Sequence, residues 1–264
     1  MSDYDTRFSG IRRLYSAAGL ERLRKSHVCV IGIGGVGSWV VEALARTGLG
    51  QLTLIDMDEV CVSNVNRQLH ALDGEIGKTK VEVMAQRARA INPECRVKAM
   101  CEFLLESNAE QILSAGYDYV VDAIDALSKK SLLIARCRER KIPIVTVGGA
   151  GGRRDPSLVR TVDLAFTSHD GLLRNLRKEL RGQYGFPRDP ETPFGVECVF
   201  SPEPVVYPQA DGTVCTKKEG DIKLRLNCDN GYGTASFVTG AFGFVAAARV
   251  VEKITKPVTN DETR

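Results

Sequence analysis

The chain has 264 residues, of which 26% are charged and 43% hydrophobic, an ordinary balance for a globular protein with a large core. Its formal net charge of +3 permits an anionic partner but does not require one. Eight cysteines without a Cys-x-x-Cys pair argue against a structural zinc site, and no signal-peptide pattern opens the chain, so we expect free thiols in the cytoplasm.

The first predicted elements are a helical arm, a strand and a glycine turn. Residues 1–27 mix basic, acidic and leucine residues, which predicts a helical arm rather than a targeting peptide. Val28 to Ile31 is a β-branched run typical of a strand buried on both faces. A backbone without Cβ atoms can approach a phosphate closely, and a helix start offers unpaired N–H groups. The turn is therefore either a phosphate cradle or a tight turn without a ligand, and its glycines are Gly32, Gly34, Gly35 and Gly37.

Strands and helices alternate from this turn to about Gly152. Strands are predicted at 28–32, 51–56, 95–101, 117–123 and 143–147, and helices at 36–47, 77–91, 107–115 and 128–140. This order predicts an α/β fold with a doubly wound, Rossmann-like, mostly parallel sheet. Ligands of such sheets bind outside the carboxyl ends of the strands, so the glycine turn, Asp56 and Asp122–Asp125 should converge on one crevice.

The composition changes after Gly152. Residues 153–188 are rich in arginine, and the apolar segment 235–251 predicts a buried helix because it is too short to span a membrane comfortably. Between them, strands are predicted near 196–200, 204–207 and 222–226. We therefore predict an N-terminal helical arm (1–27), a nucleotide-binding domain (28–152), a C-terminal α+β extension of the same sheet (153–254) and a flexible tail (255–264).

Polar side chains gather after the second predicted strand. Asp56 ends this strand about twenty residues after the glycine turn, where an acid can accept hydrogen bonds from a ribose. A guanidinium fits phosphate geometry, and a lysine can add a point charge. The segment therefore predicts a triphosphate site, with a solvated polar loop as the alternative; its polar residues are Asp58, Asn64, Arg67, Gln68 and Lys80.

Two acids follow the strand at 117–123. Asp122 and Asp125 could hold Mg²⁺, which proteins usually bind through one or two carboxylates together with substrate phosphates. Asp125 could equally be the N-cap of the next helix. The residues alone leave both possibilities open.

As a set, these motifs resemble the E1-like (ThiF-type) adenylating enzymes that activate ubiquitin-like proteins and sulfur carriers. The resemblance rests on Gly32-x-Gly-Gly-x-Gly37, Asp56-x-Asp58, Ser63-Asn64-x-x-Arg67-Gln68, Lys80 and Asp125. It implies that ATP is bound with its ribose at Asp56 and its phosphates at Asn64, Arg67, Gln68 and Lys80. It also implies that Asp125 is the essential carboxylate associated with Mg²⁺.

Further segments resemble the bacterial tRNA threonylcarbamoyladenosine dehydratases, over about residues 7 to 252. They include Arg7-Phe-Ser-Gly, Ala45-Arg-Thr-Gly48, Val147-Gly-Gly-Ala-Gly-Gly152, Cys198-Val-Phe-Ser201, Val206-Tyr-Pro-Gln209 and Gly240-Ala-Phe-Gly-Phe-Val245. This family cyclises a modified adenosine of tRNA: ATP adenylates its threonine carboxylate, and ring closure then expels AMP. The resemblance implies a cytoplasmic homodimer that acts on tRNA, with a sulfur-relay protein as a further candidate partner. In it Arg13 either reaches the partner's ATP site or is a helix-surface arginine.

Three other functions use parts of the same pattern. Adenylation of a sulfur carrier's C-terminal glycine is the nearest, but those enzymes typically carry two Cys-x-x-Cys pairs, which this chain lacks. A nicotinamide dehydrogenase would not need the Asn64, Arg67 and Gln68 cluster, and His27, His70 and His169 lie outside the expected crevice. A non-catalytic nucleotide-binding protein is disfavoured because the phosphate-binding residues are all present.

Overall fold

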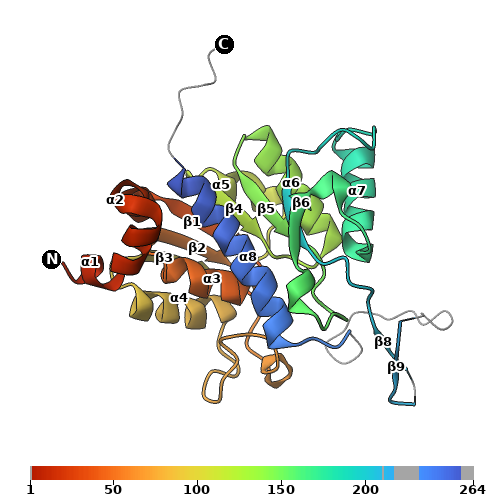
Figure 1. The fold of residues 1–264 in the computed structure, drawn as a ribbon, viewed down its shortest axis with the longest axis horizontal. Coiled ribbons are helices and arrows are strands. Elements are labelled where there is room, and N and C mark those ends of the chain that lie inside the picture. Colours follow the sequence, from red (N-terminus) through yellow and green to blue (C-terminus); the bar gives the residue numbers. More distant parts are fainter. Residues whose placement is uncertain (1, 210, 217–231, 257–264) are drawn as a thin grey trace, which may run out of the picture.

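The computed structural model describes residues 2–209, 211–216 and 232–256 (Figure 1). The helices are α1 (Asp3–Arg7), α2 (Ser9–Lys25), α3 (Gly37–Ala45), α4 (Lys80–Ile91), α5 (Glu106–Leu113), α6 (Leu127–Glu139), α7 (Gly171–Gln183) and α8 (Ser236–Thr255), with short 3₁₀ turns at Val62–Asn64, Pro156–Leu158 and Leu164–Phe166. The strands are β1 (His27–Ile31), β2 (Gln51–Ile55), β3 (Arg96–Met100), β4 (Tyr119–Asp122), β5 (Ile144–Val147), β6 (Arg160–Asp163), β7 (Glu197–Phe200), β8 (Tyr207–Pro208) and β9 (Val214–Cys215).

Seven strands form one sheet in the order β3-β2-β1-β4-β5-β7-β6. Every neighbouring pair is parallel except β6 and β7, which are antiparallel. The predicted doubly wound, mostly parallel α/β sheet is therefore confirmed. The strand order reverses between β1 and β4, and a crevice for ligands is expected at such a switch point.

Apolar side chains on both faces of the strands explain why helices cover both sides of the sheet. Val28 and Val30 pack with helices α2, α3, α4 and α8, whereas the alternate residues Cys29 and Ile31 pack with α5, α6 and α7. All five residues of β1 are buried. A strand that is apolar on both faces is stable only between two helical layers, which is the arrangement that Figure 1 shows.

The predicted elements of the first 152 residues are confirmed, with ends within three residues of those in the structure. The strand predicted at 196–200 is confirmed as β7, but β6 was not predicted. The strand predicted at 204–207 is largely wrong, because only Tyr207 belongs to a strand, and β8 pairs with β9 in a separate hairpin. The strand predicted at 222–226 lies outside the described residues, as does most of the predicted tail.

The apolar segment near the C-terminus is the buried helix that the sequence predicts. In α8, Val238, Phe242, Ala246 and Val250 are buried and belong to the core on the α3 side of the sheet. No helix in the described ranges is both long and apolar enough to cross a membrane.

The N-terminal arm packs at the amino ends of the strands. The Tyr4 hydroxyl donates to the Gly48 carbonyl at 2.5 Å, and Gly50 N–H donates to Leu23 O at 3.0 Å. Arg22 Nε donates to Ile254 O at 3.2 Å, which joins the arm to the end of α8. The arm therefore covers the edge of the sheet that lies opposite the glycine turn.

Candidate nucleotide-binding site

Three neighbouring strands bring the predicted site residues together at the edge formed by their carboxyl ends. In register, Ile31 of β1 pairs with Ile55 of β2 on one side and with Asp122 of β4 on the other. The residues that follow these three strand ends therefore start side by side. They are the glycine turn, Asp56 and the loop that carries Asp125, so the predicted convergence of these segments occurs.

The glycine turn is so tightly packed that two of its glycines have no room for a Cβ atom. Gly32 has φ +89°, and a Cβ there would lie 2.6 Å from Ala123 O. A Cβ on Gly37 would lie 1.8 Å from Gly32 O. Helix α3 starts directly after this turn without a side-chain cap at Val36. Ser38, Trp39 and Val40 N–H already donate to Gly34 O and Val36 O, so an anion would bind at the glycine turn itself, where the helix start adds partial positive charge.

Asp56 joins the second strand end to this turn. Its two carboxylate oxygens accept hydrogen bonds from Ile33 N–H at 2.6 Å and Asp58 N–H at 2.8 Å. Burial raises the pKa of Asp56 above its ordinary value, although the nearby Lys80 and these two N–H groups oppose the shift. Each oxygen keeps acceptor capacity, so the carboxylate can also receive ribose hydroxyls.

Asp58, two residues after Asp56, pairs with Lys80 and holds it near Asp56. The Lys80 ammonium lies 2.7 Å from the Asp58 carboxylate, and Lys80 N–H donates to Asp58 O at 3.0 Å. The Lys80 side chain is only 7% exposed, whereas the Asp58 side chain is 58% exposed. Helix α4 therefore begins with the ammonium of Lys80. Because the Asp58 side chain is exposed, it can rotate into solvent and leave Lys80 free to bind a phosphate.

The segment from Ser63 to Gln68 folds over the glycine turn. Buried Asn64 accepts from Cys61 N–H at 3.0 Å through its side chain, and its backbone carbonyl accepts from the N–H groups of Arg67 and Gln68. A Cβ on Gly35 would lie 3.5 Å from Arg67 Cγ, so the half-buried arginine crosses the turn. Gln68 is buried, and its Nε2 lies 4.0 Å from the Cβ position of Gly34.

Two residues that the sequence did not single out hold Arg67 in place. The indole N–H of Trp39 donates to Arg67 O at 3.1 Å, and the Thr239 hydroxyl donates to the same oxygen at 3.2 Å. They come from α3 and α8, so the loop is fixed to both helices. Trp39 follows the glycine turn by two residues, and that proximity was the only signal for it.

Asp122 does not face the crevice, in contrast to its predicted role in binding the nucleotide. It is fully buried, and its Oδ2 accepts from Thr146 Oγ1 at 2.6 Å and pairs with Lys130 Nζ at 2.8 Å. Its Oδ1 accepts from Ile124 N–H at 3.1 Å. Both oxygens are thus engaged inside the protein, where Asp122 shapes the loop that leads to Asp125.

Asp125 itself is exposed at the same edge. The N-cap of α6 is Ala126, so the alternative in which Asp125 caps this helix is wrong. Within the described ranges no hydrogen bond or ion pair engages its carboxylate. The described residues also form no cluster of three or more potential metal ligands. Asp125 is therefore a lone carboxylate, which suits a Mg²⁺ ion that takes its other oxygens from phosphates and water.

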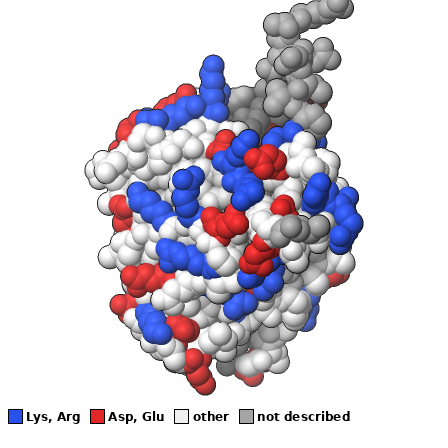
Figure 2. All heavy atoms as spheres, turned by 90° about the vertical axis from the view of Figure 1, so that its left-hand side faces the viewer, with Lys and Arg blue, Asp and Glu red and all other residues white. Residues whose placement is uncertain are grey.

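Arg13 is not part of this edge within one chain. It is exposed on α2, between Phe8 and Leu20, which both pack at Gly48 near the amino ends of the strands. Opposite charges alternate on this side of the molecule (Figure 2). Charged residues at the end of α2 are paired, Arg24 with Glu94 at 2.7 Å and Lys25 with Glu21 at 3.1 Å.

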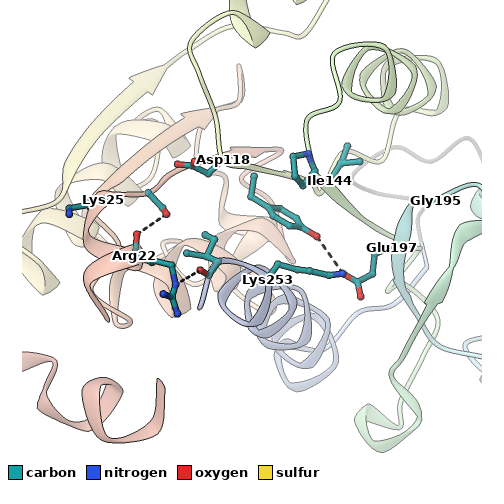
Figure 3. A pocket seen from close by; sticks show the side chains of 11 residues that line it. Arg22, Lys25, Asp118, Ile144, Gly195, Glu197 and Lys253 are labelled. Carbon is teal, nitrogen blue, oxygen red and sulfur yellow. Dashed lines mark hydrogen bonds between the residues drawn. The ribbon is translucent and has the colours of Figure 1, made fainter. Parts of the chain in front are cut away.

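A cavity of about 640 Å³ lies at the amino ends of β4, β5 and β7, the edge opposite the glycine turn (Figure 3). Its polar groups largely satisfy one another: Glu197 accepts from Arg249 Nε at 2.7 Å and from the Tyr119 hydroxyl at 3.4 Å. Arg22 caps the end of α8. The cavity is separate from the predicted crevice.

The fold agrees with that of known proteins. Residues 8–263 match the ThiF family.

The chain belongs to the ThiF family.

Within that family it belongs to the tRNA threonylcarbamoyladenosine dehydratases. It is 49% identical to the enzyme of this name from Haemophilus influenzae over 97% of this chain and 96% of the relative. It is 51% identical to the Escherichia coli enzyme over 94% and 93%. The crystal structure of the E. coli enzyme in complex with ATP superimposes with a TM-score of 0.86 at 47% identity, covering 96% of both chains. The resemblance drawn from the motifs is therefore confirmed.

Proposed function

We propose that this ThiF-family enzyme cyclises threonylcarbamoyladenosine in tRNA by using ATP to adenylate the threonine carboxylate. The observation that carries the proposal is the meeting of three strand ends around the glycine turn, with Asp56 and Lys80 on one side, Arg67 above and Asp125 on the other. The likeness to an enzyme solved with ATP supports the nucleotide, and the names of the relatives support the substrate.

In this proposal ATP extends from β2 across β1 towards β4. Its ribose hydroxyls donate to Asp56, and its phosphates lie at the glycine turn and the start of α3. Arg67, Lys80, Asn64 and Gln68 surround the triphosphate, and Lys80 leaves Asp58 to meet it. Because the Asp56 carboxylate accepts from the backbone N–H groups of Ile33 and Asp58, the position of the ribose is set before ATP arrives.

Asp125 is the residue that would hold Mg²⁺, together with phosphate oxygens and water. The ion would neutralise charge on the leaving pyrophosphate. Asp122, which the sequence grouped with Asp125, instead holds the loop through Lys130 and Thr146.

The chemistry needs two steps. A threonine carboxylate oxygen attacks the α-phosphorus of ATP, which forms an acyl adenylate and breaks the bond to pyrophosphate. The carbamoyl group of the same side chain then attacks the activated carbonyl carbon, and AMP leaves with the former carboxylate oxygen. Cationic groups fixed around the phosphates stabilise the charge that builds as pyrophosphate departs. Ring closure is intramolecular, so proximity supplies much of its rate.

We further propose a homodimer in which Arg13 serves the partner's site. Arg13 is exposed and lies away from the glycine turn of its own chain, and it neighbours Leu14, which is 71% exposed. On α8, Phe237 and Phe244 are also exposed, and a dimer would bury such apolar groups. Mixing Arg13→Ala and Asp125→Ala subunits should restore activity, because one mixed site then has both residues. Mixtures as inactive as their parents would contradict a role across the dimer.

Helix α7 offers cations for tRNA, although several of the arginines in residues 153–188 are engaged within the protein. Arg177 donates to Thr167 Oγ1, and Arg181 donates to Pro187 O at 2.9 Å. Arg153 is buried. Arg174 and Lys178 remain exposed one turn apart.

Reversing both exposed charges, Arg174→Glu with Lys178→Glu, should weaken tRNA binding and lower its salt dependence. The matched control is Arg96→Glu with Lys98→Glu on β3, at the far edge of the sheet, which should have little effect. Equal effects in both double variants would mean that α7 is not the tRNA surface.

The proposal as a whole is tested by ATP–pyrophosphate exchange. We expect exchange to require tRNA that carries threonylcarbamoyladenosine, and nucleoside mass spectrometry to show loss of one water from that adenosine. Arg67→Ala and Asp125→Ala should each abolish exchange while the circular dichroism spectrum stays unchanged. Exchange driven instead by a carrier protein that ends in Gly-Gly would identify the sulfur-carrier reaction.

A further inference from the structure

Two tyrosines form an aromatic pair beside the candidate site, and the roles assigned so far do not use them. The rings of Tyr207 and Tyr232 are 5.6 Å apart at an interplanar angle of 60°. Both side chains are half-buried, so part of each ring faces solvent. Tyr207 begins the β8–β9 hairpin, which extends from the body of the molecule in Figure 1.

The pair is fixed to the glycine loop that follows β5. Gly152 N–H donates to Gly233 O at 2.8 Å, and Gly152 O accepts from Val206 N–H at 2.9 Å. Gly152 has φ +73°, and a Cβ there would lie 2.4 Å from Val205 Cγ1. A Cβ on Gly151 would lie 3.0 Å from Tyr232 Cβ. The loop thus needs its glycines to let both tyrosine-bearing segments approach.

A buried ion pair makes this loop rigid. Arg153 and Asp170 are 3% and 6% exposed, and Arg153 lies 3.3 Å from the Asp170 carboxylate. Asp170 also accepts from Gly149 N–H at 2.9 Å, and Arg153 donates to Ser201 O at 3.1 Å. The tyrosines therefore sit on a support with little freedom, as a recognition surface requires.

The segment that carries Tyr232 is also bonded to the loop that carries Arg67. Asn66, next to Arg67, donates through its side-chain amide to Thr234 O at 2.9 Å. Strand β5 also adjoins β4, whose following loop carries Asp125. If the ATP ribose lies at β2 and its phosphates at β1, the tyrosines, which contact the loop after β5, would lie beyond the phosphates on the side away from the ribose, where the carboxylate of a substrate could enter.

We propose that Tyr207 and Tyr232 form the platform on which the purine of the modified nucleoside stacks. RNA-binding proteins commonly hold unstacked bases against aromatic rings, and each such contact strengthens binding by about 1–3 kcal/mol. A purine fixed here would place its threonyl side chain towards β4 and the phosphates. The inference rests on the proposed function, because it assumes that the substrate is a nucleoside in RNA.

The test replaces each tyrosine by leucine and by phenylalanine. We expect Tyr207→Leu and Tyr232→Leu to raise the KM for modified tRNA by about 5- to 150-fold, the range that stacking energies give, with the Kd for ATP unchanged. The phenylalanine variants keep the ring and should resemble wild type. Phe166→Leu is the matched control, because Phe166 is also an exposed aromatic residue but lies on the β6 side of the fold.

A second measurement uses the wild-type protein, so that it does not depend on the folding of variants. A tRNA with 2-aminopurine in place of the modified adenosine should lose fluorescence on binding if the base stacks on tyrosine. Unchanged fluorescence, or leucine variants with wild-type KM, would overturn the platform while the cyclisation itself stands. A wild-type enzyme that does not convert modified tRNA would instead overturn the proposed function.

Discussion

The buried pair of Asp122 and Lys130 allows a quantitative test of whether Asp122 has a structural role. Both side chains are completely buried, and their charged atoms are 2.8 Å apart. Lys130 Nζ also donates to Ile124 O at 3.0 Å. In Lys130→Met the carboxylate stays buried and keeps only Thr146 and one backbone N–H as donors. Removing one partner of a buried pair costs about 3–5 kcal/mol.

Urea denaturation followed by circular dichroism measures this cost. With a slope of about 3 kcal/mol/M, the midpoint of Lys130→Met should fall by about 1 to 1.7 M. Adding Asp122→Asn removes the isolated charge and keeps an oxygen for Ile124 N–H. The double variant should therefore recover most of the lost stability, because replacing both members of a buried pair is often nearly neutral.

ATP affinity decides between the two roles of Asp122. If Asp122 only holds the loop, the folded double variant should bind ATP and Mg²⁺ with a Kd close to that of wild type. A stable double variant that has lost ATP binding would refute this interpretation and return Asp122 to the nucleotide contacts that the sequence predicted.

Two further predictions concern the glycine turn and a buried histidine. Gly37→Ala should abolish ATP binding, since its Cβ would lie 1.8 Å from Gly32 O, whereas Gly74→Ala, with open space at its Cβ but a positive φ, should keep it; calorimetric titration distinguishes them. Burial, and then the charge of Lys80, lower the pKa of His70 to about 4. The folded-state value lies below the unfolded one, so His70 contributes about 3 kcal/mol of stability above pH 6.5, which is lost as the pH falls through 4. Urea denaturation at pH 7 and at pH 4 measures this loss. Between these two pH values His70→Leu should lose less unfolding free energy than wild type, and an equal loss in both proteins would contradict the role of His70.

The parallel part of the fold could be predicted because its signals are local. Val28 to Ile31 is apolar without interruption, and each following helix shows helical spacing, so alternation alone gives the layers. Strand β6, Arg160-Thr-Val-Asp163, has no such signal. It is an edge strand with its four residues half-buried or exposed, and only its antiparallel pairing with β7 defines it.

The site was predictable at the level of strand ends, because parallel strands bring their carboxyl ends together. The direction of each side chain was not. Asp122 and Asp125 look alike in sequence, yet one turns inward to Lys130 and the other outward. The one sequence clue was Lys130, a charged residue among the buried positions of α6. Only the structure shows that its partner is Asp122.

Oxygen transfer tests adenylation of a carboxylate most directly. The threonine carboxylate of modified tRNA is labelled with oxygen-18, and the enzyme is incubated with it, ATP and Mg²⁺. If the carboxylate attacks the α-phosphorus, the AMP released on ring closure carries one labelled oxygen, and the pyrophosphate carries none. Label in pyrophosphate or phosphate, or unlabelled AMP beside fully cyclised product, would contradict the account.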